Sequence, residues 1–436
     1  MTLILIITLI VYIGMIFFAK HRTSIAFIGA GFLLILGSVS SYFDVNAAFL
    51  KFPSEIIILI IVLALFTDLF ERVGLINYIG YKFISFSKEN RIIIMITIPL
   101  IVYFMSLWMN NLTVVLLFTY MALYLCMEYK LPIIPVLVSV VIGSNIGGAP
   151  LPWADTPAVI LTLYTNFNLA DFLTKLFIPC LVYVILLAGY TYMYYKHFTP
   201  SKELKREIPF KKKPPVRWHE ARLPMIVFVL YIIAVSVGPF VGISIAYISL
   251  LFGGILLIID KPDPMDTLNK LPIMDSIAFI IALFLIGGIL EYSGILKIAA
   301  EYIIGLTNNN PYLILLSVLF IAFIIATFLS AGPAAATLLP ICAVLAPLIP
   351  FKLIYAALAL GVLAGSSMLP WSATGGPILL SQVNRFAKRP HVPKPEKDRI
   401  NVIFNLKEYL KFSIPFSLII LCLSAVYLLA YLKILS

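Results

Sequence analysis

The sequence has few charged residues. Only 12% of its 436 residues are Asp, Glu, Lys or Arg, whereas 62% are hydrophobic; soluble domains carry about 25% charged residues. The charges cluster in short loops between apolar blocks, and many of these blocks are long enough to cross about 30 Å of hydrocarbon. This scarcity of charge argues against a soluble α/β protein and predicts an all-α polytopic membrane protein.

Cysteine and histidine are also scarce. The 4 cysteines lie singly in apolar sequence, a pattern typical of neither a disulfide framework nor a metal site. The 4 histidines all fall in polar loops, where none can bind a metal or relay protons within the membrane. Because no Walker motif for ATP is visible either, we expect no cofactor and no enzymatic activity. The net charge of +11 lies in loops between spans, which favours anionic lipid as the partner and not nucleic acid.

What the sequence does contain is an interruption within apolar sequence. Residues 144–157 read SNIGGAPLPWADTP, and their glycines and prolines argue against a continuous helix. The interruption recurs at residues 365–377, GSSMLPWSATGGP, where Leu-Pro-Trp-x-x-Thr is repeated. Trp153 corresponds to Trp371 at a spacing of 218 residues. We therefore expect two broken helices in corresponding positions.

Two further pairs of segments keep nearly the same spacing. Residues 69–75 correspond to 289–295 at a spacing of 220, and two candidate hairpin tips correspond at about 220. The chain therefore contains an internal repeat. Because each half has an odd number of predicted crossings, the second repeat must be inverted relative to the first.

Apolar blocks and polar loops together predict the organisation of the chain. The first repeat, 1–195, is expected to contain scaffold spans over 2–75, a re-entrant hairpin over 92–128, a broken helix over 132–167 and a span over 171–195. A basic cytoplasmic linker follows at 196–222. The second repeat, 223–436, is expected to contain scaffold spans over 224–292, a hairpin over 312–348, a broken helix over 353–383, a basic loop over 384–411 and a span over 412–432. Each repeat then makes about five crossings, unless the hairpin arms are two ordinary spans joined by a tight turn.

The basic residues predict the orientation. With both termini outside, 26 of the 31 lysines and arginines lie on the inner side, as the positive-inside rule requires. We therefore expect an integral protein of the cytoplasmic membrane, with its basic loops in the cytoplasm.

Unwound backbone at membrane depth is tolerated only where it lines a cavity or is buried in protein, so the breaks and hairpin tips predict a binding site at the midplane. Helix N-termini suit an anion, whereas free carbonyls and side-chain oxygens suit a small cation. The candidate substrate- or ion-binding residues are the polar and glycine residues of these segments: Asn110, Asn111, Thr113, Ser144, Asn145, Gly147, Gly148, Asp155, Thr156, Ser330, Ser366, Ser367, Ser372 and Thr374.

Asp155 is the most informative of these residues. A carboxylate deep in apolar sequence predicts a group that binds a proton or a cation. The alternative, compatible with the first, is an N-cap for the helix that resumes at Thr156 and Pro157. The corresponding residue in the second half is Ala373, so the charge at the site is asymmetric. Trp153 could stack on substrate or pack the broken helix, and the sequence does not choose between these roles.

These motifs resemble those of the ion transporter superfamily, which includes arsenite permeases, sodium/proton antiporters and citrate or dicarboxylate transporters. The resemblance rests on Asn-Asn-Leu-Thr-Val at 110–114, Ser-Asn-Ile-Gly-Gly at 144–148 and Ala-Asp-Thr-Pro at 154–157. It implies a scaffold domain, a transport domain that holds both hairpins, an elevator-like movement and a homodimer. The coupling ion would be sodium or a proton, with transient sodium at Asn111 and Asp155.

The chain departs from the pattern of this superfamily at two positions. Ala154 replaces the usual glycine, and the second hairpin tip at 330–333 lacks the expected asparagine, which argues against a second, symmetric sodium site. The sequence therefore predicts a secondary active transporter that moves a small ion or anion by alternating access. Sodium/proton exchange, arsenite efflux and di- or tricarboxylate transport are the candidate activities. A channel or a membrane-embedded enzyme is the alternative class.

Overall fold

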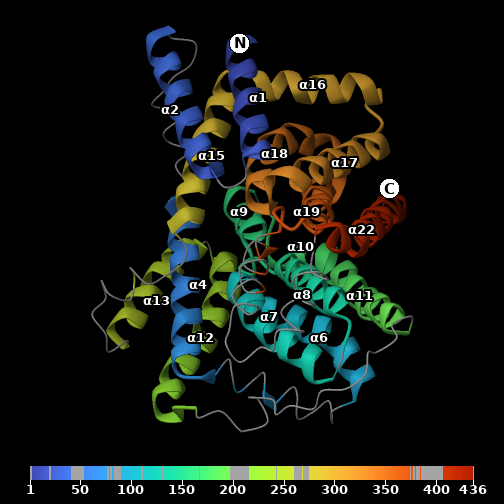
Figure 1. Cartoon of the computed structure of the whole chain (residues 1–436). Coiled ribbons are helices and arrows are strands. Elements are labelled where there is room, and N and C mark those ends of the chain that lie inside the picture. Colours follow the sequence, from blue (N-terminus) through green and yellow to red (C-terminus); the bar gives the residue numbers. More distant parts are fainter. Residues whose placement is uncertain are drawn as a thin grey trace.

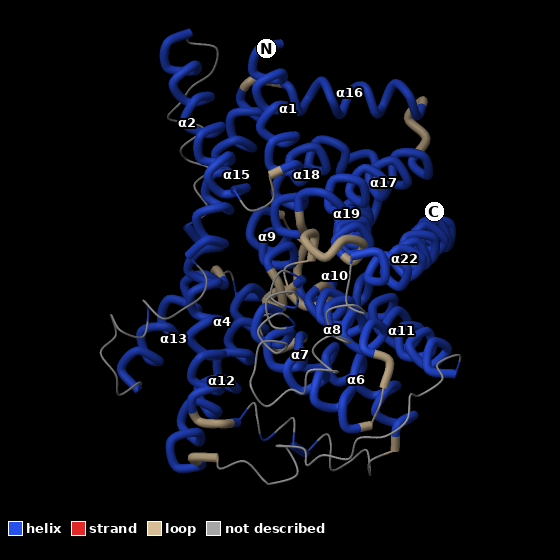
Figure 2. The backbone as a smooth tube through the Cα atoms, in the orientation of Figure 1, coloured by secondary structure: helices blue, strands red, loops and turns tan. Residues whose placement is uncertain are grey.

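In the part of the chain that the computed structural model describes, every regular element is a helix (Figure 2). The described residues are 2–18, 21–40, 54–75, 78, 81–82, 90–109, 111–129, 131–165, 167–196, 216–241, 243–259, 268, 274–373, 375–376, 379, 383 and 406–435.

The first half begins with three helices of the predicted scaffold and continues with the helices of the hairpin, the broken helix and the last span. They are α1 (Thr2–Phe17), α2 (Arg22–Ser40), α4 (Ser54–Arg72), α6 (Arg91–Ser106), α7 (Asn111–Glu128), α8 (Ile133–Gly148), α9 (Thr156–Tyr164), α10 (Leu169–Phe172), a π-helical turn (Leu173–Phe177) and α11 (Ile178–Lys196). On α4, Asp68 and Arg72 form the i,i+4 ion pair that their spacing predicts, with the Arg72 Nε atom 2.7 Å from Asp68 Oδ2.

The second half has a corresponding series of helices. They are α12 (Trp218–Val237), α13 (Ile245–Ile259), α15 (Met274–Tyr292), α16 (Ile295–Thr307), α17 (Pro311–Leu329), α18 (Ala331–Leu345), α19 (Leu353–Ser366) and α22 (Leu406–Leu435). Among the described residues, five helical stretches are long and apolar enough to cross a bilayer: Leu169–Tyr194, Trp218–Val237, Pro311–Leu329, Ala331–Leu348 and Leu406–Ile434.

Helices from the two halves pair in a reciprocal way. Figure 1 shows α1, α2 and α15 at one end of one side of the molecule, α4, α12 and α13 at the other end of that side, and α16 crossing above α17 and α18. Helix α2 of the first half packs on α15 of the second, and α13 of the second half packs on α4 of the first. The hairpin helices, the broken helices, α11 and α22 form a helical body beside them (Figure 1), and α4, α15 and α16 contact this body. This exchange agrees with two related halves, while the inversion of one half relative to the other remains a prediction.

Glycine contacts repeat at the same spacing inside this body. Gly147 of α8 packs on α6, where an added Cβ would overlap the Tyr103 carbonyl oxygen. Gly365 of α19 packs on α17 in the same way, where an added Cβ would overlap the Phe323 carbonyl oxygen. Small residues allow helix backbones in a membrane to approach closely. The interrupted helices are therefore held against the first arm of each hairpin by close backbone contact.

A buried ion-pair cluster joins the two halves away from the breaks. Asp171 accepts hydrogen bonds from Lys175 Nζ at 2.5 Å and from Lys352 Nζ at 2.8 Å. Asp171 also closes a capping box with Asn168 at the start of α10. The cluster ties the segment after α9 to the segment that precedes α19, and charged groups inside a membrane protein are stable only with such partners.

The outer helices expose large apolar side chains, as expected for a surface in contact with lipid. Ile28 on α2 is 71% exposed and Ile258 on α13 is 85% exposed. An aqueous protein rarely presents extended apolar faces of this kind. The polar groups of the predicted site lie instead within the body.

Candidate functional site

The first break is shorter than the sequence predicts. The glycines and prolines of 144–157 predict an interruption that begins at Gly147, but α8 continues to Gly148 and the break covers 149–155. Gly147 and Gly148 do not unwind the chain. They lie within α8, where the absence of a side chain permits close packing. Pro150 and Pro152, which cannot donate a backbone hydrogen bond, lie in the interruption itself.

Asp155 lies where the chain re-enters a helix. It occupies the N-cap position of α9 with extended backbone angles, φ −149° and ψ 166°, and Pro157 follows in the first turn. The Asp155 side chain makes no capping hydrogen bond. The backbone position that the capping hypothesis requires is therefore present, but the carboxylate is directed to another partner.

That partner is Asn111 at the tip of the first hairpin. The Nδ2 atom of Asn111 donates a hydrogen bond to Asp155 Oδ2 at 2.8 Å. Asn111 is the first residue of α7 and is fully buried. Gly148 lies between the two, since an added Cβ would stand 2.6 Å from Asn111 Nδ2 and 2.8 Å from the Asp155 Cβ. The hairpin tip and the first break thus form one polar centre.

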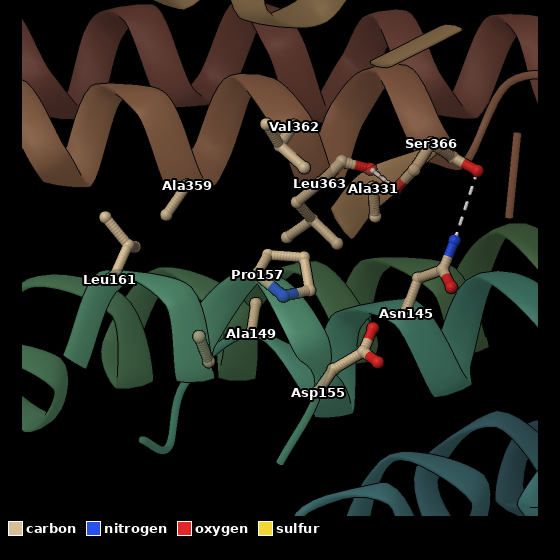
Figure 3. Close-up of a pocket in the computed structure, with 12 residues that line it drawn as sticks. Asn145, Ala149, Asp155, Pro157, Leu161, Ala331, Ala359, Val362, Leu363 and Ser366 are labelled. Atoms are coloured by element: carbon tan, nitrogen blue, oxygen red, sulfur yellow. Dashed lines mark hydrogen bonds between the residues drawn. The ribbon is translucent and has the colours of Figure 1, made fainter. Parts of the chain in front are cut away.

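A small pocket opens beside this centre (Figure 3). Its walls come from both halves of the chain: Asn145, Gly148, Ala149, Asp155, Pro157, Ala158, Leu161, Ala331, Ala359, Val362, Leu363 and Ser366. Its volume of ≈ 20 Å³ accommodates a water molecule or a small ion. Among the described residues that line it, Asp155 carries the only formal charge, so the pocket favours a cation over a free anion.

A hydrogen bond between the halves closes one side of the pocket. Asn145 Nδ2 donates to the backbone carbonyl of Ser366 at 3.2 Å, and Figure 3 shows the two residues facing each other. The second hairpin tip contacts the first break nearby. A Cβ on Gly332 would lie 2.9 Å from Thr156 Cγ2, and Ser330 precedes it with φ 95°. The site therefore combines both hairpin tips with both interrupted helices.

Several oxygens near the first break have no hydrogen-bonding partner within the described protein. They are Asn111 Oδ1, Ser106 Oγ and Ser144 Oγ, each on a fully buried residue. Ser106 ends α6, and its Cβ would lie 2.7 Å from a Cβ on Gly147. Oxygens that lack a donor are suitable ligands for a small cation. Ser106 was absent from the predicted set, although a polar residue in the last turn before the Asn-Asn tip is a sequence signal that could have identified it.

The predicted serines of the second break have a different role. Ser372 Oγ contacts the carbonyls of Ser366 at 3.1 Å and Leu369 at 2.8 Å, and Ser367 Oγ donates to Leu363 O at 2.8 Å. These hydroxyls form hydrogen bonds with backbone carbonyls, and neither Ser367 nor Ser372 lines the pocket. Asn110, Thr374 and the side chain of Thr113 lie outside the described residues.

Trp153 packs against another tryptophan. Its ring centroid lies 6.1 Å from that of Trp108, next to the first hairpin tip, and Trp153 is only 3% exposed. It does not line the pocket. In this structure, Trp153 therefore takes the packing role and not the substrate-stacking role that the sequence left open.

A helical membrane fold with a buried polar pocket between two interrupted helices defines the class of membrane transporters. The chain belongs to the citrate transporter family, CitMHS, whose model matches residues 4–361 and 273–436. This family is part of the ion transporter superfamily that the motifs resemble, so that prediction is confirmed.

Similar proteins extend over nearly the whole chain. The magnetosome protein MamN of Magnetospirillum gryphiswaldense is 24% identical over 409 residues and covers 92% of each chain. An uncharacterized transporter of Mycobacterium tuberculosis is 24% identical over 366 residues, covering 82% of this chain and 83% of its own. The YdaH transporter of Alcanivorax borkumensis has a similar fold, with a TM-score of 0.56 at 12% identity and coverage of 92% and 88% of the two chains.

Proposed function

We propose that the chain is a secondary active transporter that exchanges a small cation, sodium first among the candidates, for protons by alternating access. The observation that carries this proposal is the Asp155 carboxylate, the only formal charge among the described pocket residues, held 2.8 Å from Asn111. A carboxylate inside a membrane is costly when ionised and unpaired, so it favours binding either a cation or a proton. Competition between these two ligands for one group couples their movements in opposite directions.

The neighbouring oxygens support a cation as the occupant. Asn111 Oδ1 and the hydroxyls of Ser106 and Ser144 are buried without a hydrogen-bonding partner in the described part of the chain, and oxygen atoms are the ligands that sodium takes from unwound backbone and polar side chains in transporters. The pocket volume of ≈ 20 Å³ suits an ion of this size in the present conformation.

The movement in this proposal follows the division of the helices. The body that carries both breaks would move against the scaffold formed by α1, α2, α4, α12, α13 and α15, as the superfamily resemblance implies. We further propose that the protein works as a homodimer in the cytoplasmic membrane, with both termini outside. The basic linker at 196–222 would then face the cytoplasm.

A second candidate is cation-coupled transport of a carboxylate. The family description names citrate, and this observation favours an organic anion as cargo. In that case a cation at Asp155 would neutralise the pocket before the anion binds. Asp155 and its neighbours would then bind the coupling cation and form only part of the site that binds the carboxylate.

Transport by purified protein in liposomes separates the candidates. A sodium gradient should move protons, detected with an internal pH dye, without any added carboxylate. Sodium-dependent uptake of labelled citrate or succinate without proton exchange would favour the second candidate. Absence of both activities, or bilayer currents far above the turnover of a carrier, would contradict the proposed mechanism. Labelled arsenite can be tested as a further substrate in the same assay.

A further inference from the structure

Helix α22 closes the backbone of the second break with two hydroxyl groups. Ser417 Oγ donates to the carbonyl of Ala364 at 2.5 Å, and Ser413 Oγ donates to the carbonyl of Met368 at 2.7 Å. Both serines are fully buried. Their acceptors lie in the last turn of α19 and just after it, so one face of α22 covers the end of this interrupted helix.

These hydroxyls behave differently from others in the same helical body. Thr191 donates to Leu187 O on its own helix at 2.7 Å, and Thr327 donates to Phe323 O on its own helix at 2.8 Å. Such bonds to the preceding turn are the usual solution for serine and threonine inside helices. Ser413 and Ser417 instead reach across to another element, which makes the position of α19 depend on α22.

The hydrogen bonds continue from this element to the pocket. Ser372 Oγ contacts the Ser366 carbonyl at 3.1 Å, and Asn145 Nδ2 donates to the same carbonyl at 3.2 Å. Asn145 and Ser366 both line the pocket beside Asp155 (Figure 3). A carbonyl held by the second break thus orients an amide of the first.

The carbonyls at the end of a helix carry partial negative charge and need a donor or a cation. At the second break they have side-chain donors: Ser417 on Ala364 O, Asn145 on Ser366 O, Ser413 on Met368 O and Ser372 on Leu369 O. At the first break, the side-chain oxygens Asn111 Oδ1 and Ser144 Oγ have no hydrogen-bonding partner among the residues that the structure describes. The two breaks are therefore different in chemistry as well as in sequence.

We propose that Ser413 and Ser417 are positioning residues, which hold the end of α19 as a fixed wall that supports the cation site at the first break. This inference rests on the proposed function for its effect on sodium. The second break keeps its shape through hydroxyl donors and needs no cation of its own, so one sodium ion binds per transport cycle. Helix α22 acts on that ion through the Ser366 carbonyl and Asn145.

The test compares Ser413→Ala and Ser417→Ala with Ser424→Ala. Ser424 lies on the same helix, is equally buried and shares a 2.8 Å hydrogen bond with Tyr183 of α11, so its loss removes a comparable bond without touching the second break. Two measurements on the full chain are needed: hydrogen–deuterium exchange in detergent, and the sodium concentration for half-maximal transport in liposomes.

We expect Ser413→Ala and Ser417→Ala to accelerate exchange over residues 364–372 and 145–155, and Ser424→Ala to leave both segments unchanged. Half-saturation by sodium should rise about threefold to tenfold in the first two variants, as expected for one intramembrane hydrogen bond, with the maximal rate retained. Ser417→Thr, which keeps the hydroxyl donor, should raise half-saturation less than Ser417→Ala does. The wild-type sodium dependence should have a Hill coefficient near one.

Unchanged exchange in both segments would overturn the positioning role whatever the transport results are. Faster exchange with an unaltered half-saturation would overturn the link to the cation site, and a Hill coefficient near two would overturn the single sodium ion. If wild-type protein shows no sodium-dependent transport, the proposed function fails. The exchange at 145–155 then still decides whether α22 positions the first break.

Discussion

Substitution of Gly148 by alanine tests whether the hairpin tip and the first break act as one centre. A Cβ at Gly148 would lie 2.6 Å from Asn111 Nδ2 and 2.8 Å from Asp155 Cβ, whereas ordinary contacts begin at 3.4 Å. Each of the two side chains must therefore move away from position 148 by several tenths of an ångström. This movement distorts the 2.8 Å hydrogen bond between them.

The expected magnitude follows from these contacts. Overpacking of a dense interior costs about 1–3 kcal/mol, and a hydrogen bond to a charged group contributes about 1.5–3 kcal/mol. If the substitution weakens sodium binding by about 1.4 kcal/mol of this total, the sodium concentration for half-maximal transport rises roughly tenfold. We expect the thermal unfolding midpoint to fall as well, because part of the strain remains in the folded protein.

Gly189→Ala is the matched control in the same liposome and thermal unfolding assays. Gly189 lies within α11, and nothing lies within 4 Å of a Cβ at this position. Alanine there should be neutral or slightly stabilising, because it favours the helix by about 1 kcal/mol over glycine. The reasoning is refuted if Gly148→Ala retains the wild-type half-saturation, or if Gly189→Ala weakens sodium dependence to the same extent.

Two further substitutions test the packing and the ion pairs. Asp171→Asn leaves the buried Lys175 without its carboxylate and should destabilise the protein by about 3–5 kcal/mol. The thermal unfolding midpoint should fall, and an unchanged midpoint would contradict the buried ion pair. Gly365→Ala places a Cβ against the Phe323 carbonyl and should lower both stability and transport. Gly254→Ala, at a position within α13 with nothing within 4 Å, should lower neither, and equal losses in the two variants would argue against close packing of α17 and α19.

Local composition was sufficient to predict the main features of the fold. Proline and glycine at 147–157 predicted an interruption, and the structure has one at 149–155. The spacing of about 220 residues predicted corresponding elements, and Gly147 and Gly365 make corresponding contacts at a spacing of 218. The predicted start of the break was wrong because glycine can either unwind a helix or allow another helix to pack closely against it. At Gly147 and Gly148 the structure has close packing.

The polar centre was only partly accessible from the sequence. Asn111 and Asp155 could be chosen because each is a polar residue at an expected tip or break, but their 2.8 Å contact depends on tertiary packing. The roles of Ser413 and Ser417 could not be predicted from the sequence, because the hydroxyl of a serine within an apolar span usually donates its hydrogen bond to a carbonyl of its own helix. Their role becomes visible only when α22 lies across the end of α19.

The most direct test of the central claim is sodium-driven proton movement by Asp155→Asn in liposomes. Asparagine keeps the shape of the side chain and removes its charge, so we predict that the protein remains folded but loses coupled exchange. Asp68→Asn, which alters an ion pair on α4 away from the pocket, should transport normally. Full sodium/proton exchange by a folded Asp155→Asn protein would contradict the assignment of this carboxylate as the exchange group.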